Sequence, residues 1–200
     1  MRGMFRNLAF GAVMVAVAAA SPNAFAADSG SAFASRLFDG PVKQKSYACF
    51  VRVYDADHLA RHPRQKVSAM TLLVEAEKVP EDASLNYSFR LGLKYRNRHG
   101  AFDSSGDCGH ADSAASGHLG CGVDCDGGGL DVNLTADNKS VMVKVERIRI
   151  WRDNKPDDEA SNHSLVAGAD DRLFRLDRAS LMTCKPLITD RKELAALRRK

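Results

Sequence analysis

The chain lacks the sequence motifs of several common enzyme classes. It contains no GxSxG nucleophile elbow, no Walker A phosphate loop and no GxGxxG dinucleotide fingerprint. No two cysteines form a CxxC pair, and no HExxH zinc-protease motif occurs. The sequence therefore gives no support to a serine hydrolase, a nucleotide-dependent enzyme, a thioredoxin-like protein or a zinc protease of these types.

Long hydrophobic runs are also missing, apart from one near the start. Residues 8–20 are apolar except for Gly11. This run is too short to span a bilayer, which requires roughly 20 apolar residues. Arg2 and Arg6 precede this run, and Ala24-Phe25-Ala26 follows it as a small-x-small cleavage site. We therefore interpret residues 1–26 as a cleavable signal peptide, with no transmembrane segment after cleavage. An uncleaved membrane anchor is the alternative.

No excess of one charge marks the mature chain. The full sequence has 29 Lys and Arg against 25 Asp and Glu, and the predicted signal contains two of the arginines and no acid. The formal net charge thus falls from +4 to +2 on cleavage. A nucleic-acid-binding protein is expected to carry a basic stripe, so no nucleic-acid partner is predicted. The setting predicted for an exported chain is periplasmic or secreted.

Cysteine is sparse, but in an exported protein the five cysteines are expected to form disulfides. We expect Cys108 to pair with Cys121 or Cys125, because these loops are the shortest to close. Cys184 then pairs with the remaining loop cysteine or with Cys49. An odd count leaves at least one thiol, and Cys49, between apolar neighbours, is the expected free thiol.

Alternating side chains predict strands along most of the chain. The clearest is Leu85–Arg96, where apolar and polar residues alternate strictly, so Phe89 is expected to be buried and Arg90 exposed. A switch of apolar parity near Glu146–Arg147 predicts a β-bulge. Further strands are expected at Tyr47–Tyr54, Val67–Ala76, Leu130–Thr135, Val141–Ile150 and Leu173–Leu176, and a short helix at Asp55–His62.

These elements predict a mainly β protein of six or seven strands. The expected architecture is a single antiparallel β-sandwich or partly closed barrel with short helices and a C-terminal helix. Residues 27–45 are interpreted as a flexible lead-in with Phe33, Leu37 and Phe38 able to dock, residues 46–188 as the β domain, and residues 189–200 as a basic helix. His99–Gly129 is interpreted as a long loop. The alternative is an α+β domain with the helix packed on a sheet.

The segment 107–131 holds the strongest metal-binding candidates. Zinc favours four sulfur or nitrogen ligands, and calcium favours six or more oxygens. The spacing fits neither a zinc pattern nor an EF-hand closely, so a disulfide-stapled loop is the favoured interpretation and no cofactor is predicted. The candidate zinc ligands are Cys108, His110, His118, Cys121 and Cys125, and the candidate calcium ligands are Asp124, Asp126 and Asp131.

His58 and His62 lie four residues apart, and therefore on one face of the predicted short helix. The intervening residues supply no glutamate to act as a general base. A solvated helix face is the favoured interpretation of this pair, with a metal site as the alternative.

Three stretches resemble small exported bacterial proteins to which no activity is assigned. They are SYACFVRVYDADHLARHPRQKVSAMTLLV, LGCGVDCDGGGLDV and LFRLDRASLMTCKPL. This resemblance implies a Gram-negative periplasmic setting and transfers no functional residue. The sequence thus predicts a non-catalytic binding or envelope-associated module, whose partner is an unknown ligand or envelope protein. The alternative is a metal-dependent enzyme or metal-binding protein using residues 107–131.

Overall fold

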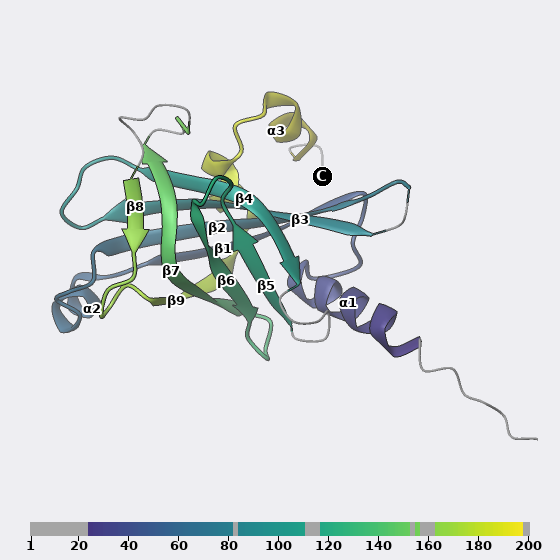
Figure 1. Ribbon diagram of the computed structural model, residues 1–200, viewed down its shortest axis with the longest axis horizontal. Helices are drawn as coiled ribbons and strands as arrows, with labels where there is room; N and C mark the ends of the chain where they lie inside the picture. The colour runs from purple at the N-terminus through teal and green to yellow at the C-terminus, as the bar shows by residue number, and fades with distance from the viewer. Residues whose placement is uncertain (1–23, 82–83, 111–116, 153–154, 157–162, 198–200) are drawn as a thin grey trace, which may run out of the picture.

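The structure is a computed structural model that describes residues 24–81, 84–110, 117–152, 155–156 and 163–197 (Figure 1). Most of the predicted signal peptide, residues 1–23, lies outside this range. The elements in chain order are α1 (Ala24–Leu37), β1 (Lys45–Val53), α2 (Ala56–Arg61), β2 (Val67–Lys78), β3 (Leu85–Tyr95), β4 (Phe102–His110), β5 (His118–Gly122), β6 (Gly128–Leu134), β7 (Ser140–Arg152), β8 (His163–Val166), β9 (Leu173–Ala179), the 3₁₀ helix η3 (Leu181–Leu187) and α3 (Arg191–Leu197).

The strands form one antiparallel sheet whose pairings close into a ring. Each strand from β1 to β6 pairs with the next, β6 pairs with β7, β7 with β9, and β9 with β1. The short strand β8 adds to the second half of β7. The sheet therefore takes a near-barrel form with short helices and a C-terminal helix. This confirms the predicted fold class, although the described residues form nine strands where six or seven were expected.

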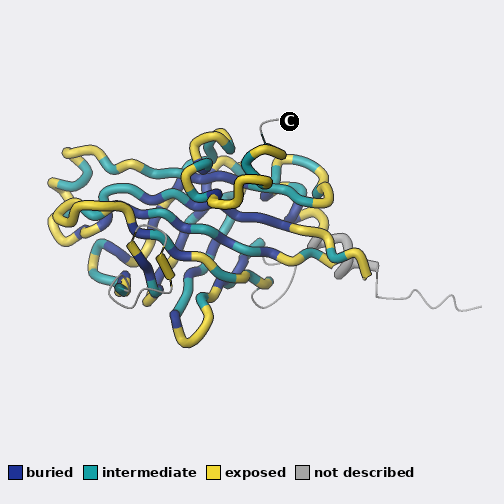
Figure 2. The backbone as a smooth tube through the Cα atoms, turned by 90° about the horizontal axis from the view of Figure 1, so that it is seen from above, coloured by how far each residue is buried: buried dark blue, intermediate teal, exposed yellow. Residues whose placement is uncertain are grey.

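The inward side chains form one continuous apolar core. Figure 2 shows the buried residues along the strands, with exposed residues at many of the connections. Phe89 is 1% exposed, as its place in the alternating pattern of β3 predicts. The bulge is also where the parity switch predicts it, because Val145 pairs with Leu130 and Arg147 with Gly129, which leaves Glu146 as the extra residue. The same alternation therefore positions β3 and both halves of β7 against one core.

The interpretation of His99–Gly129 as a long loop is wrong, because this segment contains β4 and β5. These strands can lie close to their neighbours because glycine has no side chain that would separate the backbones. A Cβ atom at Gly106 would lie 1.9 Å from the carbonyl oxygen of Gly122 on the neighbouring strand. Gly128, with φ +71°, would place a Cβ atom 2.0 Å from the Arg147 carbonyl oxygen. A composition that normally indicates a loop here permits close strand contact.

Residues 27–45, interpreted above as a flexible lead-in, are partly helical, since α1 occupies Ala24–Leu37. Phe33, Ala34 and Leu37 are buried, which confirms the expected docking of Phe33 and Leu37. The guanidinium of Arg178 donates to the carbonyl oxygens of Arg36 and Leu37 at 3.1 and 2.9 Å. It thereby satisfies the last carbonyl groups of α1, which no residue within the helix can reach.

The C-terminal segment covers part of the outer face of the sheet, so the expected exposure of Arg90 is wrong. Arg90 donates to Glu193 of α3 at 3.0 and 3.1 Å and to Glu75 of β2 at 3.3 Å. Burial, together with a hydrogen bond to Glu193, raises the pKa of the neighbouring Tyr47. The helix predicted for residues 189–200 is thus present as α3, and it packs on strands from the first half of the chain.

Candidate functional site

Four of the five cysteines form two disulfides. Cys108 pairs with Cys121, one of the two partners that the sequence predicts, across neighbouring positions of β4 and β5. Cys49 pairs with Cys184, so the prediction of a free thiol at Cys49 is wrong, and the free thiol is the exposed Cys125. The reason is the facing of β1: Cys49 lies on the outer face, where η3 places the buried Cys184 against it.

Several candidate metal ligands of residues 107–131 have other partners, whereas Cys125 is free. The disulfide occupies the sulfur atoms of Cys108 and Cys121. The turn after β5 offers the carbonyl oxygens of Asp124 and Asp126, but these accept hydrogen bonds from Arg149 and Arg147. Within the described ranges, no three His, Cys, Asp or Glu side chains are grouped as a metal site would need. Among the described residues, neither the candidate zinc ligands nor the candidate calcium carboxylates are thus brought together as a group of three.

His58 and His62 do lie together, but as part of a packed helix end. Asp55 caps α2 by accepting from the backbone N–H of His58 at 2.7 Å. The two imidazole rings stack with centroids 4.2 Å apart, and the Tyr54 ring lies 4.5 Å from His58. His58 also shares a hydrogen bond of 3.0 Å with Gln65. These contacts orient the histidines along the wall of a surface hollow described below.

A basic hollow of about 270 Å³ lies beside residues 63–66, the segment that follows α2. Four cations line it: Arg64 and Lys66 from the segment before β2, and Arg96 and Arg98 from the segment after β3. No acidic side chain is among its described lining residues. The remaining lining residues are Pro63, Gln65, Tyr95, Asn97, Ser164, Leu165 and Val166. We call this the first hollow.

The second hollow, of about 470 Å³, shares Gln65 with the first. Its cations are Arg52, Arg172 and Arg175, and its single described acid is Asp170. The carboxylate of Asp170 accepts from the backbone N–H of Arg64 at 3.1 Å. The other lining residues are Tyr54, His58, His62, Gln65, Met142, Ala169 and Leu173. The two hollows together are called the basic end.

The cations of the first hollow have few internal partners. Within the ranges given above, none of Arg64, Lys66, Arg96 and Arg98 forms an ion pair. All four are exposed. Arg98 lies over the rings of Tyr95 and Phe102, at 4.9 and 4.6 Å from their centroids. The side chains thus present positive charge that the described protein does not neutralise.

The second hollow is more balanced, because Asp177 neutralises part of its charge. Arg52 and Arg175 contact Asp177 at 3.0 and 3.3 Å. A hydrogen bond from Ser140, together with both arginines, lowers the pKa of Asp177. Burial raises the pKa of Tyr54, so its phenol stays protonated and able to donate. The uncompensated charge of the basic end is therefore concentrated in the first hollow.

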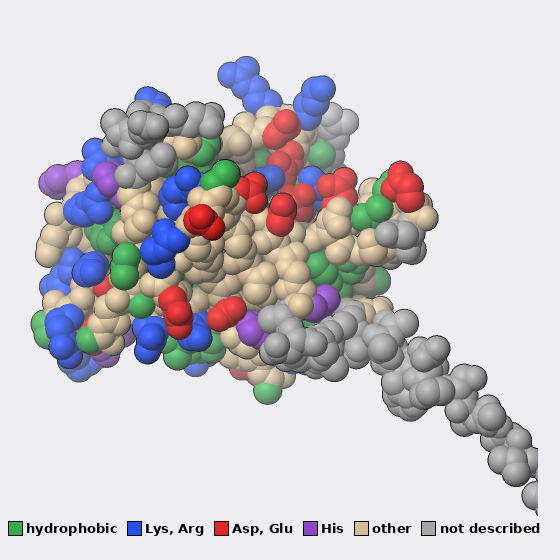
Figure 3. Space-filling view, in the orientation of Figure 1, with side chains coloured by type: hydrophobic (Ala, Val, Ile, Leu, Met, Phe, Trp, Pro, Cys, Tyr) green, Lys and Arg blue, Asp and Glu red, His purple; other side chains and the backbone are tan. Residues whose placement is uncertain are grey.

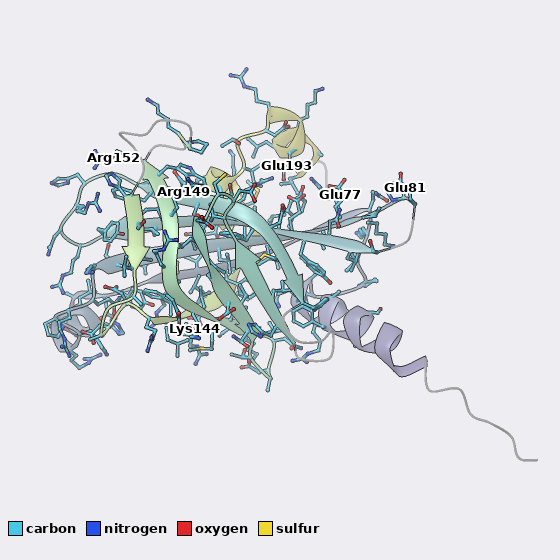
Figure 4. The ribbon with its side chains drawn as sticks, in the orientation of Figure 1. Glu77, Glu81, Lys144, Arg149, Arg152 and Glu193 are labelled. Atoms are coloured by element: carbon cyan, nitrogen blue, oxygen red, sulfur yellow. A yellow bond between two sulfur atoms is a disulfide. The ribbon has the colours of Figure 1, made fainter. Side chains whose placement is uncertain are left out.

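The charges are unevenly distributed over the molecule. Figure 3 shows Lys and Arg side chains gathered at the end that carries α2 and β8, while many Asp and Glu side chains lie toward the opposite end. Figure 4 places Arg149 and Arg152 on β7, and Glu77, Glu81 and Glu193 on the other side of the molecule. A nearly neutral total charge therefore conceals a basic end.

The basic end is not among the sites that the sequence predicts. Its signals are two short basic stretches, 61–66 (RHPRQK) and 95–99 (YRNRH), separated by about thirty residues. They meet because β2 and β3 form a hairpin that pairs Val67 with Tyr95. Either stretch alone is unremarkable for a loop, so only the register of the hairpin identifies the site.

Comparison with models of known families, with curated proteins and with solved structures finds no match. In the part of the chain that the structure describes, no helix has both the length and the apolar character required to cross a bilayer.

Proposed function

We propose that this protein is an exported, non-catalytic binding module of the cell envelope, whose basic end recognises an anionic ligand. Two disulfides support an oxidising setting, and the predicted signal peptide favours the periplasm. The observation that carries the proposal is the first hollow, where four exposed cations line a concavity without an acidic lining residue among those described. Such a site matches the charge of phosphate, sulfate or carboxylate groups.

The geometry favours binding over catalysis. The hollow offers guanidinium and ammonium donors, a tyrosine and a serine, but no described acid that could act as a general base. The uncompensated charges hold an anion electrostatically, and the forked guanidinium groups can bind its oxygens in pairs. A ligand with several anionic groups could contact both hollows at once, since they share Gln65.

The test is titration of inorganic tripolyphosphate into the folded, oxidised protein, at low and high salt. We expect binding that weakens with salt, because the hollow is exposed and its charges are screened. The double variant R64E/K66E should abolish it. The backbone N–H groups of Arg64 and Lys66 donate to the carboxylates of Asp170 and Asp171, and this variant keeps both backbone groups.

The matched control is R191E/K192E, which makes the same change in net charge on the exposed face of α3. It should bind tripolyphosphate like the wild type. Absence of binding by the wild type, or equal weakening by both variants, would exclude the basic end as a specific anion site.

A further inference from the structure

Exposed apolar side chains accompany the charges of the basic end. Four large apolar side chains are exposed in the described residues: Val53, Val166, Leu173 and Met182. Val166, 50% exposed, lines the first hollow, and Leu173, 56% exposed, lines the second. Val53 ends β1 just before α2. A small soluble anion in the hollows would leave Val166 and Leu173 in water, whereas a ligand that also has apolar parts would cover them.

The same end combines groups that suit a membrane interface. Tyr54 and Tyr95 are half-buried, with apolar rings and polar hydroxyl groups, and arginine and tyrosine side chains can keep their polar tips in the headgroup layer. Val166 ends β8 and lines the first hollow, and Leu173 begins β9 and lines the second. Charge and apolar surface together are the two contributions that bind proteins to anionic lipid surfaces.

The charge distribution would orient the molecule at such a surface. The labelled acids Glu77, Glu81 and Glu193 lie away from the basic end (Figure 4). A negatively charged surface therefore attracts the basic end, where the cations of the first hollow have no acidic lining residue among those described. This steering favours approach with Arg64, Lys66, Arg96 and Arg98 toward the lipid.

We propose that the basic end docks on the headgroup layer of an anionic phospholipid surface, with its cations on lipid phosphates and Val166 and Leu173 inserted among the lipids. This inference rests on the proposed function, because it identifies the anionic ligand as lipid. It makes the lipid, and not a soluble phosphate compound, the occupant of the two hollows.

The experiment is sedimentation of the oxidised protein with vesicles of phosphatidylcholine containing about 30 mol% phosphatidylglycerol, compared with vesicles of phosphatidylcholine alone. We expect binding to the anionic vesicles only. R64E/K66E should weaken it by at least about 25-fold, because each basic residue near such a surface strengthens binding roughly fivefold. V166S/L173S should weaken it about tenfold and leave tripolyphosphate binding unchanged.

Two controls accompany these variants. R191E/K192E replaces an arginine and a lysine outside the basic end, and M182S replaces an exposed apolar side chain there. Both variants should bind the anionic vesicles like the wild type. If tripolyphosphate binds but anionic vesicles do not, the lipid inference fails while the proposed function stands. If V166S/L173S binds vesicles like the wild type, or if neutral vesicles bind equally well, the inference also fails. If neither probe binds, both proposals fail.

Discussion

At the scale of single residues, several polar groups are bonded to partners far away in the sequence. Arg178 holds the end of α1 and also lies over the Phe50 ring at 4.8 Å. Burial lowers the pKa of Arg178, but Arg36 and Leu37 keep its charge hydrogen-bonded through their carbonyl oxygens. Arg90 similarly connects two strands to α3. Arg178 and Arg90 thus attach α1 and α3 to the sheet.

The first prediction concerns Arg90. Arg90→Ala should lower the free energy of unfolding by about 2–4 kcal/mol, because Glu75 and Glu193, with side chains 10% and 11% exposed, lose their shared cation. Lys94→Ala on the same strand removes an exposed cation and should change it by less than about 0.5 kcal/mol. Urea unfolding monitored by fluorescence measures both. Equal small effects would mean that α3 does not dock through Arg90.

A second prediction concerns acid stability. The pKa of Asp177 is lower in the folded protein than its ordinary value of 3.8, so its contribution is present above about pH 4 and is lost as the pH falls through the folded pKa. Asp177→Asn should therefore reduce the loss of stability between neutral and acidic pH. Ser140→Ala removes the strongest of the hydrogen bonds that lower this pKa and should act in the same direction. Urea unfolding across the pH range is the measurement, and an unchanged pH dependence in Asp177→Asn would refute it.

At the scale of elements, the two disulfides join segments of very different separation. The bond between Cys108 and Cys121 closes a separation of 13 residues within one β-hairpin. The bond between Cys49 and Cys184 spans 135 residues and attaches η3 to β1. The long-range bond, with Glu193, therefore secures the C-terminal segment on the outer face of the sheet.

The third prediction compares the two bonds. In the chain-entropy account, the long bond contributes about 5 kcal/mol and the short bond about 3 kcal/mol. Cys49→Ala/Cys184→Ala should therefore lower the free energy of unfolding more than Cys108→Ala/Cys121→Ala. Chemical denaturation of the two double variants, after non-reducing peptide mapping of the wild type, tests the order. A larger loss from the Cys108 pair would contradict it.

At the scale of the whole molecule, export and folding are compatible. Removal of residues 1–26 would take Ala24, Phe25 and Ala26 from α1 but keep Phe33, Ala34 and Leu37, which are buried. The barrel and both disulfides lie entirely after the predicted cleavage site. Cleavage therefore keeps Phe33 and Leu37, which belong to the core.

The fourth prediction is a mature N-terminus at Ala27. Intact-mass measurement of the exported protein should give the mass of residues 27–200 with both disulfides formed. A membrane-bound species that retains residues 1–26 would show that the segment is an anchor.

The sequence by itself determined what depends on neighbouring residues. Alternation placed β3 and buried Phe89, the parity switch located the bulge at Glu146, and loop length favoured a local partner for Cys108. Only the tertiary structure decided that Cys49 meets Cys184, that Arg90 is half-buried, and that Arg64 and Arg98 line one hollow. The physical reason is that side-chain periodicity and loop entropy act locally. The partners of an outward-facing side chain depend instead on strand register and on which distant segment covers that face.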